Sequence, residues 1–178
     1  MTAPVLETAR LILRPHTVAD LDDCFALRRD PEVMRYIGGK PQTREEAWMR
    51  VLRNIGHWAA SGYGFWLARE RATGRAVGEV GIADFRRDLE PPFDQGAEAG
   101  WVLATWAHGQ GLATEAMTAV LAWADASPAV GAKIMCLIDE ANAGSIRVAA
   151  KLGFHEVART AYKDTPVNIY ERVRPRGR

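Results

Sequence analysis

The stretch 102–117, VLATWAHGQGLATEAM, places two glycines between an apolar run and a segment whose apolar residues have helical spacing. Glycine lets a ligand approach the backbone closely, and the first amides of a helix have no partner within that helix. The helix dipole adds partial positive charge at the same end. The stretch therefore predicts a phosphate or pyrophosphate site built from backbone N–H groups. Those N–H groups belong to Gly109, Gln110, Gly111, Leu112, Ala113 and Thr114.

Two well-known nucleotide-binding loops fit this stretch poorly. A P-loop requires Lys and then Ser or Thr after its last glycine, whereas Leu112 and Ala113 follow Gly111. A dinucleotide fingerprint requires a third small residue where Thr114 stands, within a βαβ unit. On the loop alone, a tight strand-to-helix connection without a ligand stays open.

The composition is that of an ordinary globular domain, which we expect to span residues 1–178. The chain has 23 Lys and Arg against 22 Asp and Glu, and 48% of its residues are hydrophobic. This balance argues against nucleic-acid and membrane partners. Two distant cysteines, Cys24 and Cys136, predict buried thiols, and with no N-terminal signal we expect a cytoplasmic protein. The arginines at 172, 174, 176 and 178 predict a solvated basic tail.

The remaining elements predict one mixed α/β layer structure. A strand opens the chain, followed by helices, a hairpin turning at 72–75, and a strand that enters the glycine loop. Thr43 and Glu46 form a capping box at the start of the third helical segment, and Gly62 ends it. The expected segments are strands at 9–16, 64–71, 76–85, 97–104, 133–142 and a hairpin at 154–173, with helices at 17–30, 43–61 and 143–153. A short helical turn starts at Pro31, and a further helix has its apolar face between Ala113 and Ala124.

Two motifs in this order resemble the GNAT superfamily of acyl-CoA-dependent N-acetyltransferases, and more closely its Rim-type branch. They are HGQGLATEA at 108–116 and NAGSIRVAAKLGF at 142–154. The likeness extends to ETARLILRPHTVADLDDCFAL, DPEVMRYI, AVGEVGI and VNIYERV, and so covers nearly the whole chain. Gly111 and Ala113 match the last fixed positions of the family's pyrophosphate loop, and His108 stands where relatives usually have Gln or Arg.

The resemblance implies a central, mostly antiparallel sheet whose two middle strands splay apart, flanked by helices. Acetyl-CoA would be the co-substrate, with its pyrophosphate on the loop and its pantetheine arm beside Trp101, Val102 and Leu103. Asn142 would lie near the pantetheine as well as capping a helix. No metal is expected, and a homodimer is possible.

The expected reaction is direct attack of an amine on the thioester. The arriving ammonium must lose a proton, for which Glu98 and Glu79 are the candidate bases. Ser145 matches the Rim-type serine that protonates the leaving thiolate, although an ordinary helix-start role is an equal alternative.

The acceptor stays open between a protein N-terminus, a polyamine, an antibiotic amine and an amino-acid-like metabolite. Acidic residues in the loop 86–96, at 88, 90 and 94, would suit a cationic acceptor. The alternative to an enzyme is a non-catalytic acyl-CoA-binding or regulatory module.

Overall fold

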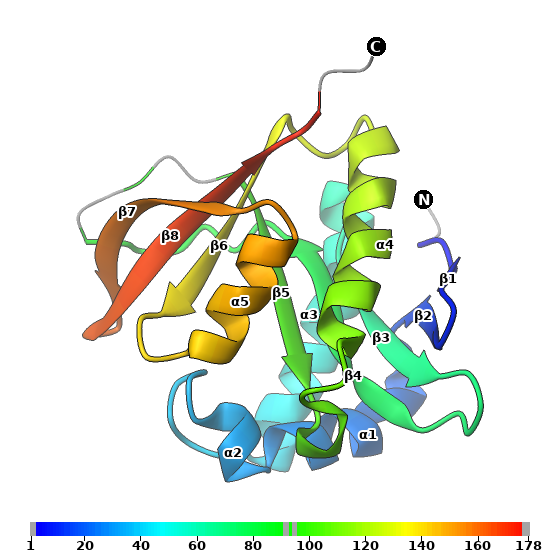
Figure 1. Cartoon of the computed structure of the whole chain (residues 1–178). Helices are drawn as coiled ribbons and strands as arrows, with labels where there is room; N and C mark the ends of the chain where they lie inside the picture. Colours follow the sequence, from blue (N-terminus) through cyan, green and yellow to red (C-terminus); the bar gives the residue numbers. More distant parts are fainter. Residues whose placement is uncertain (1–2, 91–92, 94–95, 176–178) are drawn as a thin grey trace.

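The computed structural model describes residues 3–90, 93 and 96–175. Strands and helices follow one another along the chain in the order that the sequence predicts, with the opening strand divided in two (Figure 1). The strands are β1 (Leu6–Glu7), β2 (Leu11–Pro15), β3 (Phe65–Glu70), β4 (Ala76–Ala83), β5 (Ala97–Leu103), β6 (Lys133–Asp139), β7 (His155–Tyr162) and β8 (Thr165–Val173). The helices are α1 (Leu21–Arg28), α2 (Pro31–Met34), α3 (Arg44–Ser61), α4 (Leu112–Ala126) and α5 (Ala143–Lys151), with 3₁₀ turns at Val18–Asp20 and Thr105–Ala107.

All eight strands form one sheet in the order β1-β2-β3-β4-β5-β6-β8-β7. Each neighbouring pair is antiparallel except β5 and β6, which are parallel. These two central strands pair only at Ala97 with Ile134 and at Glu98 with Met135, and then diverge (Figure 1). The predicted mixed α/β fold with a splayed, mostly antiparallel sheet is therefore confirmed.

Helices cover both faces of the sheet: α4 and α5 lie on one face and α3 on the other, with α1 and α2 at the lower edge (Figure 1). The core is apolar and tightly packed, and Trp66, Ile82 and Met117 are each fully buried within it. Trp58 and Trp123 pack edge-on against Trp66, with ring centroids 4.6 and 5.2 Å away, as aromatic rings prefer. In the described residues no helix is long and apolar enough to cross a membrane.

Local chain chemistry sets the helix ends. The Thr43–Glu46 capping box forms in both directions, and Gly62 ends α3 in the left-handed conformation at φ +76°. Gly74 adopts φ +72° in the predicted hairpin turn. In the segment 17–30, expected as one helix, Thr17 precedes the 3₁₀ turn Val18–Asp20, and α1 begins one turn later.

The prediction of a solvated basic tail is wrong for the two arginines of the tail that the structure describes. Arg172 holds Asp125 through two N–H···O bonds of 2.8 and 2.6 Å. Arg174 donates to the carbonyl oxygens of Ala124, Ser127 and Val130, which lie at and just beyond the C-terminus of α4. These side chains fasten β8 to α4. Arg176 and Arg178 lie outside the described residues.

Candidate active site

The N-terminus of α4 presents a run of free backbone donors. Gly109 and Gly111 both take positive φ values, +74° and +75°, and Gly111 caps the helix without a side-chain hydrogen bond. Among the described residues, none of the amides at 109–114 donates to a protein acceptor. In α3 and α5, by contrast, the side chains of Thr43 and Asn142 each accept from an amide of the first turn. Six consecutive donors at a helix N-terminus suit a pyrophosphate group.

Side chains of the protein brace this loop from outside. His108 Nε2 lies 2.9 Å from the carbonyl oxygen of Leu103, and Gln110 Nε2 donates to the carbonyl oxygen of Trp106 at 2.7 Å. Arg10 donates to the carbonyl oxygen of Gln110 at 3.0 Å. The side chain of Gln110 therefore faces the protein and leaves only its amide for a ligand. The amide of His108 donates to the carbonyl oxygen of Thr105 at 3.1 Å, so His108 offers neither its side chain nor its backbone N–H.

A second support was not expected from the sequence. Glu115 accepts from the Thr8 hydroxyl at 2.6 Å and from the backbone amide and Nε of Arg10 at 2.8 and 2.6 Å. A carboxylate in the first turn of a helix also complements the helix dipole. The partners of Glu115 lie more than 100 residues earlier, so only the folded chain shows that the segment between β1 and β2 fixes the loop.

The divergence of β5 from β6 leaves a gap beside the loop. Beyond Glu98, β5 keeps its pairing with β4 as far as Leu103 but loses β6 on the other side. Trp101 and Val102 are half-buried along this edge, and Leu103 is buried. An extended ligand that enters the gap would meet unpaired strand edge, as in peptide recognition by strand addition.

Helix α5 closes one side of the gap and brings three predicted residues together. Asn142 accepts from the Ser145 amide at 3.0 Å and caps the helix. Trp101 Nε1–H donates to the Ser145 hydroxyl oxygen at 3.3 Å. Since an indole N–H can only donate, the serine oxygen accepts here and its own proton is free for another acceptor.

Glu98 lies at the point where the strands part, and it is 6% exposed. Its two oxygens accept from Arg87 Nε at 2.6 Å and Nη2 at 2.7 Å. Arg87 is stacked between the rings of Phe85 and Tyr162, each 4.7 Å from its guanidinium carbon. Burial lowers the pKa of Arg87, but the hydrogen bond to Glu98 more than offsets this, so the pKa of Arg87 is raised.

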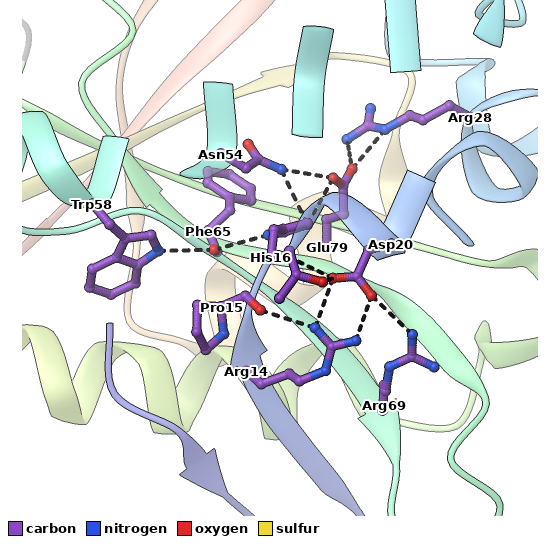
Figure 2. Close-up of polar contacts among 11 residues, drawn as sticks. Arg14, Pro15, His16, Asp20, Arg28, Asn54, Trp58, Phe65, Arg69 and Glu79 are labelled. Carbon is purple, nitrogen blue, oxygen red and sulfur yellow. Dashed lines mark hydrogen bonds and ion pairs between the residues drawn. The ribbon is translucent and has the colours of Figure 1, made fainter. Parts of the chain in front are cut away.

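Glu79 lies within a buried polar network and is fully enclosed (Figure 2). Arg28 donates two hydrogen bonds to its Oε2, the one from Nε measuring 2.8 Å. Asn54 donates to Oε1 at 2.8 Å, and His16 Nε2 lies 3.2 Å from the same oxygen. Burial would raise the pKa of Glu79, but Arg28, His16 and Arg50 hold it well below its usual value. The structure therefore separates this candidate base from solvent and joins β4 to α1 and α3 through it.

Cys24 also approaches this network, since its Sγ and one atom each of His16 and Glu79 lie within 4.8 Å of one another. The three residue types can bind a metal ion. However, the Arg28 guanidinium is already bound to Glu79 and would repel a cation. Burial and the neighbouring carboxylates Glu79 and Asp20 raise the pKa of the Cys24 thiol, so the protonated form is favoured.

A family model described as an acetyltransferase (GNAT) domain matches residues 10–155. The YkkB protein of Bacillus subtilis is 34% identical over 173 residues, which cover 94% of each chain. The chain belongs to the GNAT acetyltransferase family. A solved Bordetella pertussis structure assigned to the same family is 34% identical, with a TM-score of 0.85 over 96% of this chain and 100% of that one. The GNAT family predicted from the two motifs is thereby confirmed, and with it an acetyl-CoA-dependent acetyltransferase.

More distant GNAT structures share the fold. One is RimL, the ribosomal L7/L12 α-N-protein acetyltransferase, in complex with coenzyme A. It is 16% identical, with a TM-score of 0.77 over 96% of this chain and 98% of that one.

On the α3 side of the sheet, this GNAT domain has a pocket of about 260 Å³ beside the Arg87–Glu98 pair. It is lined by Arg53, Phe85, Arg86, Arg87, Asp88, Tyr162 and Lys163. Basic residues outnumber acidic ones among these lining residues. Asp88 does line the pocket, Glu90 pairs through its backbone with Ala161, and Asp94 lies outside the described residues.

A larger hollow of about 430 Å³ lies elsewhere, between α1, α2 and the edge formed by β3, β4 and the turn after β5. Asp23, Asp30, Arg75 and Trp106 are among its lining residues. It contains none of the predicted site residues, whereas the smaller pocket borders the Arg87–Glu98 pair.

Proposed function

We propose that this protein transfers an acetyl group from acetyl-CoA directly to the nitrogen of an amine. The observation that carries this proposal is the run of six amides at 109–114 that donate to no acceptor among the described residues, placed at the end of the gap between β5 and β6. Neither half of this arrangement is needed for a simple turn. Together they suit a ligand with a pyrophosphate at one end and a thin, amide-bearing arm at the other.

We assign separate tasks to the residues around the gap. The amides of Gly111, Leu112 and Ala113 would hold the pyrophosphate, and β5 at Trp101 and Val102 would pair with the arm. Ser145, whose proton is not used within the protein, would donate it to the departing thiolate. Because a thiolate is a fairly stable leaving group, this donation would contribute modestly to the rate.

The amine must lose a proton before it attacks. Glu98 is the carboxylate that borders the gap, and each of its oxygens keeps a lone pair after binding Arg87, so it can receive a proton through a water molecule. Proton loss straight to solvent is the alternative. Glu79 is fully buried with both oxygens engaged, and we propose a structural role for it.

The test is thiol release from acetyl-CoA with and without a panel of amines and N-terminal peptides, beside calorimetric titration of acetyl-CoA. Amine-dependent release is expected, and Glu98→Gln separates the two proton routes: loss of release assigns the base to Glu98, whereas unchanged release assigns it to solvent. Glu140→Gln, a carboxylate change on the exposed turn after β6, serves as the matched control. Donor binding without release for any amine would favour the non-catalytic acyl-CoA-binding module.

A further inference from the structure

Arg10 lies between β1 and β2, yet its side chain reaches the glycine loop and the first turn of α4. Its Nε donates to Glu115 Oε2 at 2.6 Å, and its Nη1 donates to the carbonyl oxygen of Gln110 at 3.0 Å. The backbone amide of Arg10 also donates to Glu115, at 2.8 Å. Two of the three guanidinium nitrogens are thus fixed by the loop that we assign to the pyrophosphate.

The third nitrogen, Arg10 Nη2, lies beside Gly111, the N-cap of α4. A Cβ placed on Gly111 would lie 3.8 Å from Nη2, and no other atom of the described residues beyond the chain neighbours of Gly111 is within 4 Å of that point. Nη2 itself donates to no acceptor in the part of the chain that the structure describes, and the Arg10 side chain is 49% exposed. A pair of N–H groups is therefore available at the N-terminus of α4.

The charges around the loop favour an anion here. A cation at the N-terminus of a helix is unfavourable by itself, because the helix dipole is positive at this end. Glu115 offsets the charge of Arg10, and its oxygens are occupied by donors from the segment between β1 and β2. Arg71 is paired with Glu7, and Arg75 stacks on the ring of the tryptophan that precedes the loop. An anion on the loop amides would be attracted by the helix dipole and by Arg10 together.

We infer that Arg10 is a direct ligand of a phosphate group of acetyl-CoA, in addition to the backbone amides of the loop. The inference rests on the proposed function, because it adds a residue to the donor site of the same reaction. A guanidinium fork matches phosphate oxygens, and charge-assisted hydrogen bonds are the stronger ones. Since Nε and Nη1 are already held, little side-chain freedom is lost when Nη2 binds. The pyrophosphate is the expected partner, because the loop amides adjoin Nη2, and the 3′-phosphate of coenzyme A is the other source of the same chemistry.

The test is calorimetric titration of acetyl-CoA and of 3′-dephospho-acetyl-CoA into the wild type and Arg10→Gln. We expect Arg10→Gln to bind both compounds about tenfold more weakly, since it loses a hydrogen bond to a charged group. A loss confined to acetyl-CoA would assign the contact to the 3′-phosphate. Unchanged affinity for both compounds would overturn the inference.

A second measurement separates a direct contact from a brace, because Arg10→Gln also removes the bond to Gln110. Salt screens a contact between exposed charges, so the affinity of the wild type should fall more steeply with ionic strength than that of Arg10→Gln. Equal slopes would reduce Arg10 to a positioning residue and overturn the direct contact. Glu115→Gln keeps Arg10 and removes a negative charge, so it should bind acetyl-CoA at least as tightly as the wild type. A loss as large as that of Arg10→Gln would likewise overturn the contact.

The matched control is Arg71→Gln, which removes the same charge from a neighbouring ion pair of similar exposure and should leave acetyl-CoA binding unchanged. The Arg10–Glu115 pair is partly exposed, and such pairs contribute little to stability, so Arg10→Gln should remain folded. Failure of the wild type to bind acetyl-CoA would contradict the proposed function. Wild-type binding without a loss in Arg10→Gln would contradict only this inference.

Discussion

The indole Nε1–H of Trp101 donates to Ser145 Oγ across the space between β5 and α5, at 3.3 Å. Trp101 belongs to the strand that borders the gap, and Ser145 to the first turn of the helix that covers it. The contact fixes the serine as an acceptor toward the strand. The hydroxyl proton of Ser145 therefore points away from Trp101, and the adjoining space is the gap between β5 and β6.

Replacing Ser145 with alanine should therefore lower kcat by about 10- to 100-fold, at the low end of what general acid catalysis provides. The KM of acetyl-CoA should change little, because the hydroxyl is needed only as the thiolate leaves. Steady-state thiol release over a pH series measures both. Trp101→Phe keeps the hydroxyl but removes its donor, so a loss as large as that of Ser145→Ala would show that orientation, and not proton donation, matters.

Gly111 should be the least replaceable residue of the glycine loop. Alanine at φ +75° costs about 1 kcal/mol of stability, and any shift of the backbone would misdirect the amides that follow. We expect Gly111→Ala to weaken acetyl-CoA binding at least tenfold in calorimetric titration. Gly56→Ala in α3, where a Cβ would meet open space, should instead raise the unfolding free energy by up to about 1 kcal/mol and leave binding intact.

Glu79 should govern stability rather than turnover. Glu79→Gln leaves Arg28 as an uncompensated buried charge, so the unfolding free energy measured with urea should fall by about 3–5 kcal/mol. Glu32→Gln, which removes an exposed partner of Arg35, should cost less than about 1 kcal/mol. A small loss in Glu79→Gln would mean that the network tolerates a neutral partner.

Stability should also fall in acid because of Glu79. Its pKa is lower in the folded protein than the ordinary value of 4.5, so the unfolded chain binds the proton more readily. The stabilisation is complete above about pH 5 and is lost as the pH falls below 4.5. Urea unfolding at a series of pH values should show a shallower decline for Glu79→Gln than for the wild type. Parallel declines would assign acid sensitivity to Asp20, whose pKa Arg14 and Thr17 also depress.

Arg50 on α3 is half-buried and forms no ion pair with a residue that the structure describes. Arg50→Met keeps the aliphatic stem and removes a charge whose pKa is lowered by burial, so the unfolding free energy should stay equal or rise by less than about 1 kcal/mol. Arg174→Met, which removes the donor of hydrogen bonds to three carbonyl oxygens, should lower the unfolding free energy. Chemical denaturation of both variants gives the comparison, and a marked loss in Arg50→Met would point to a structural role for this side chain.

The parts of the molecule that follow from neighbouring residues were predictable from sequence. The capping box at Thr43 and the glycine stop at Gly62 depend on residues within one helical turn, and the glycine loop carries its own signature. The order of strands and helices followed from hydrophobic periodicity and from the GNAT motifs.

Residues whose partners are distant in sequence were not predictable in this way. Glu79 lies in a strand that is buried on both faces, so the alternation of polar and apolar residues does not predict whether its side chain is buried. Its partner Arg28 is 51 positions away in the sequence. The same applies to the pairing of Glu115 with Arg10, and to Arg172 and Arg174, which bind helix α4 instead of water.

The short pairing of β5 with β6 also places two bare strand edges inside the molecule. Exposed edges are hazards because another chain can add to them and start aggregation. Here α5 covers the gap between β5 and β6. The long antiparallel pairings of β4 with β5 and of β6 with β8 hold each strand in place. The two unpaired strand edges are therefore covered against pairing with another polypeptide. A thin, extended ligand can still reach them.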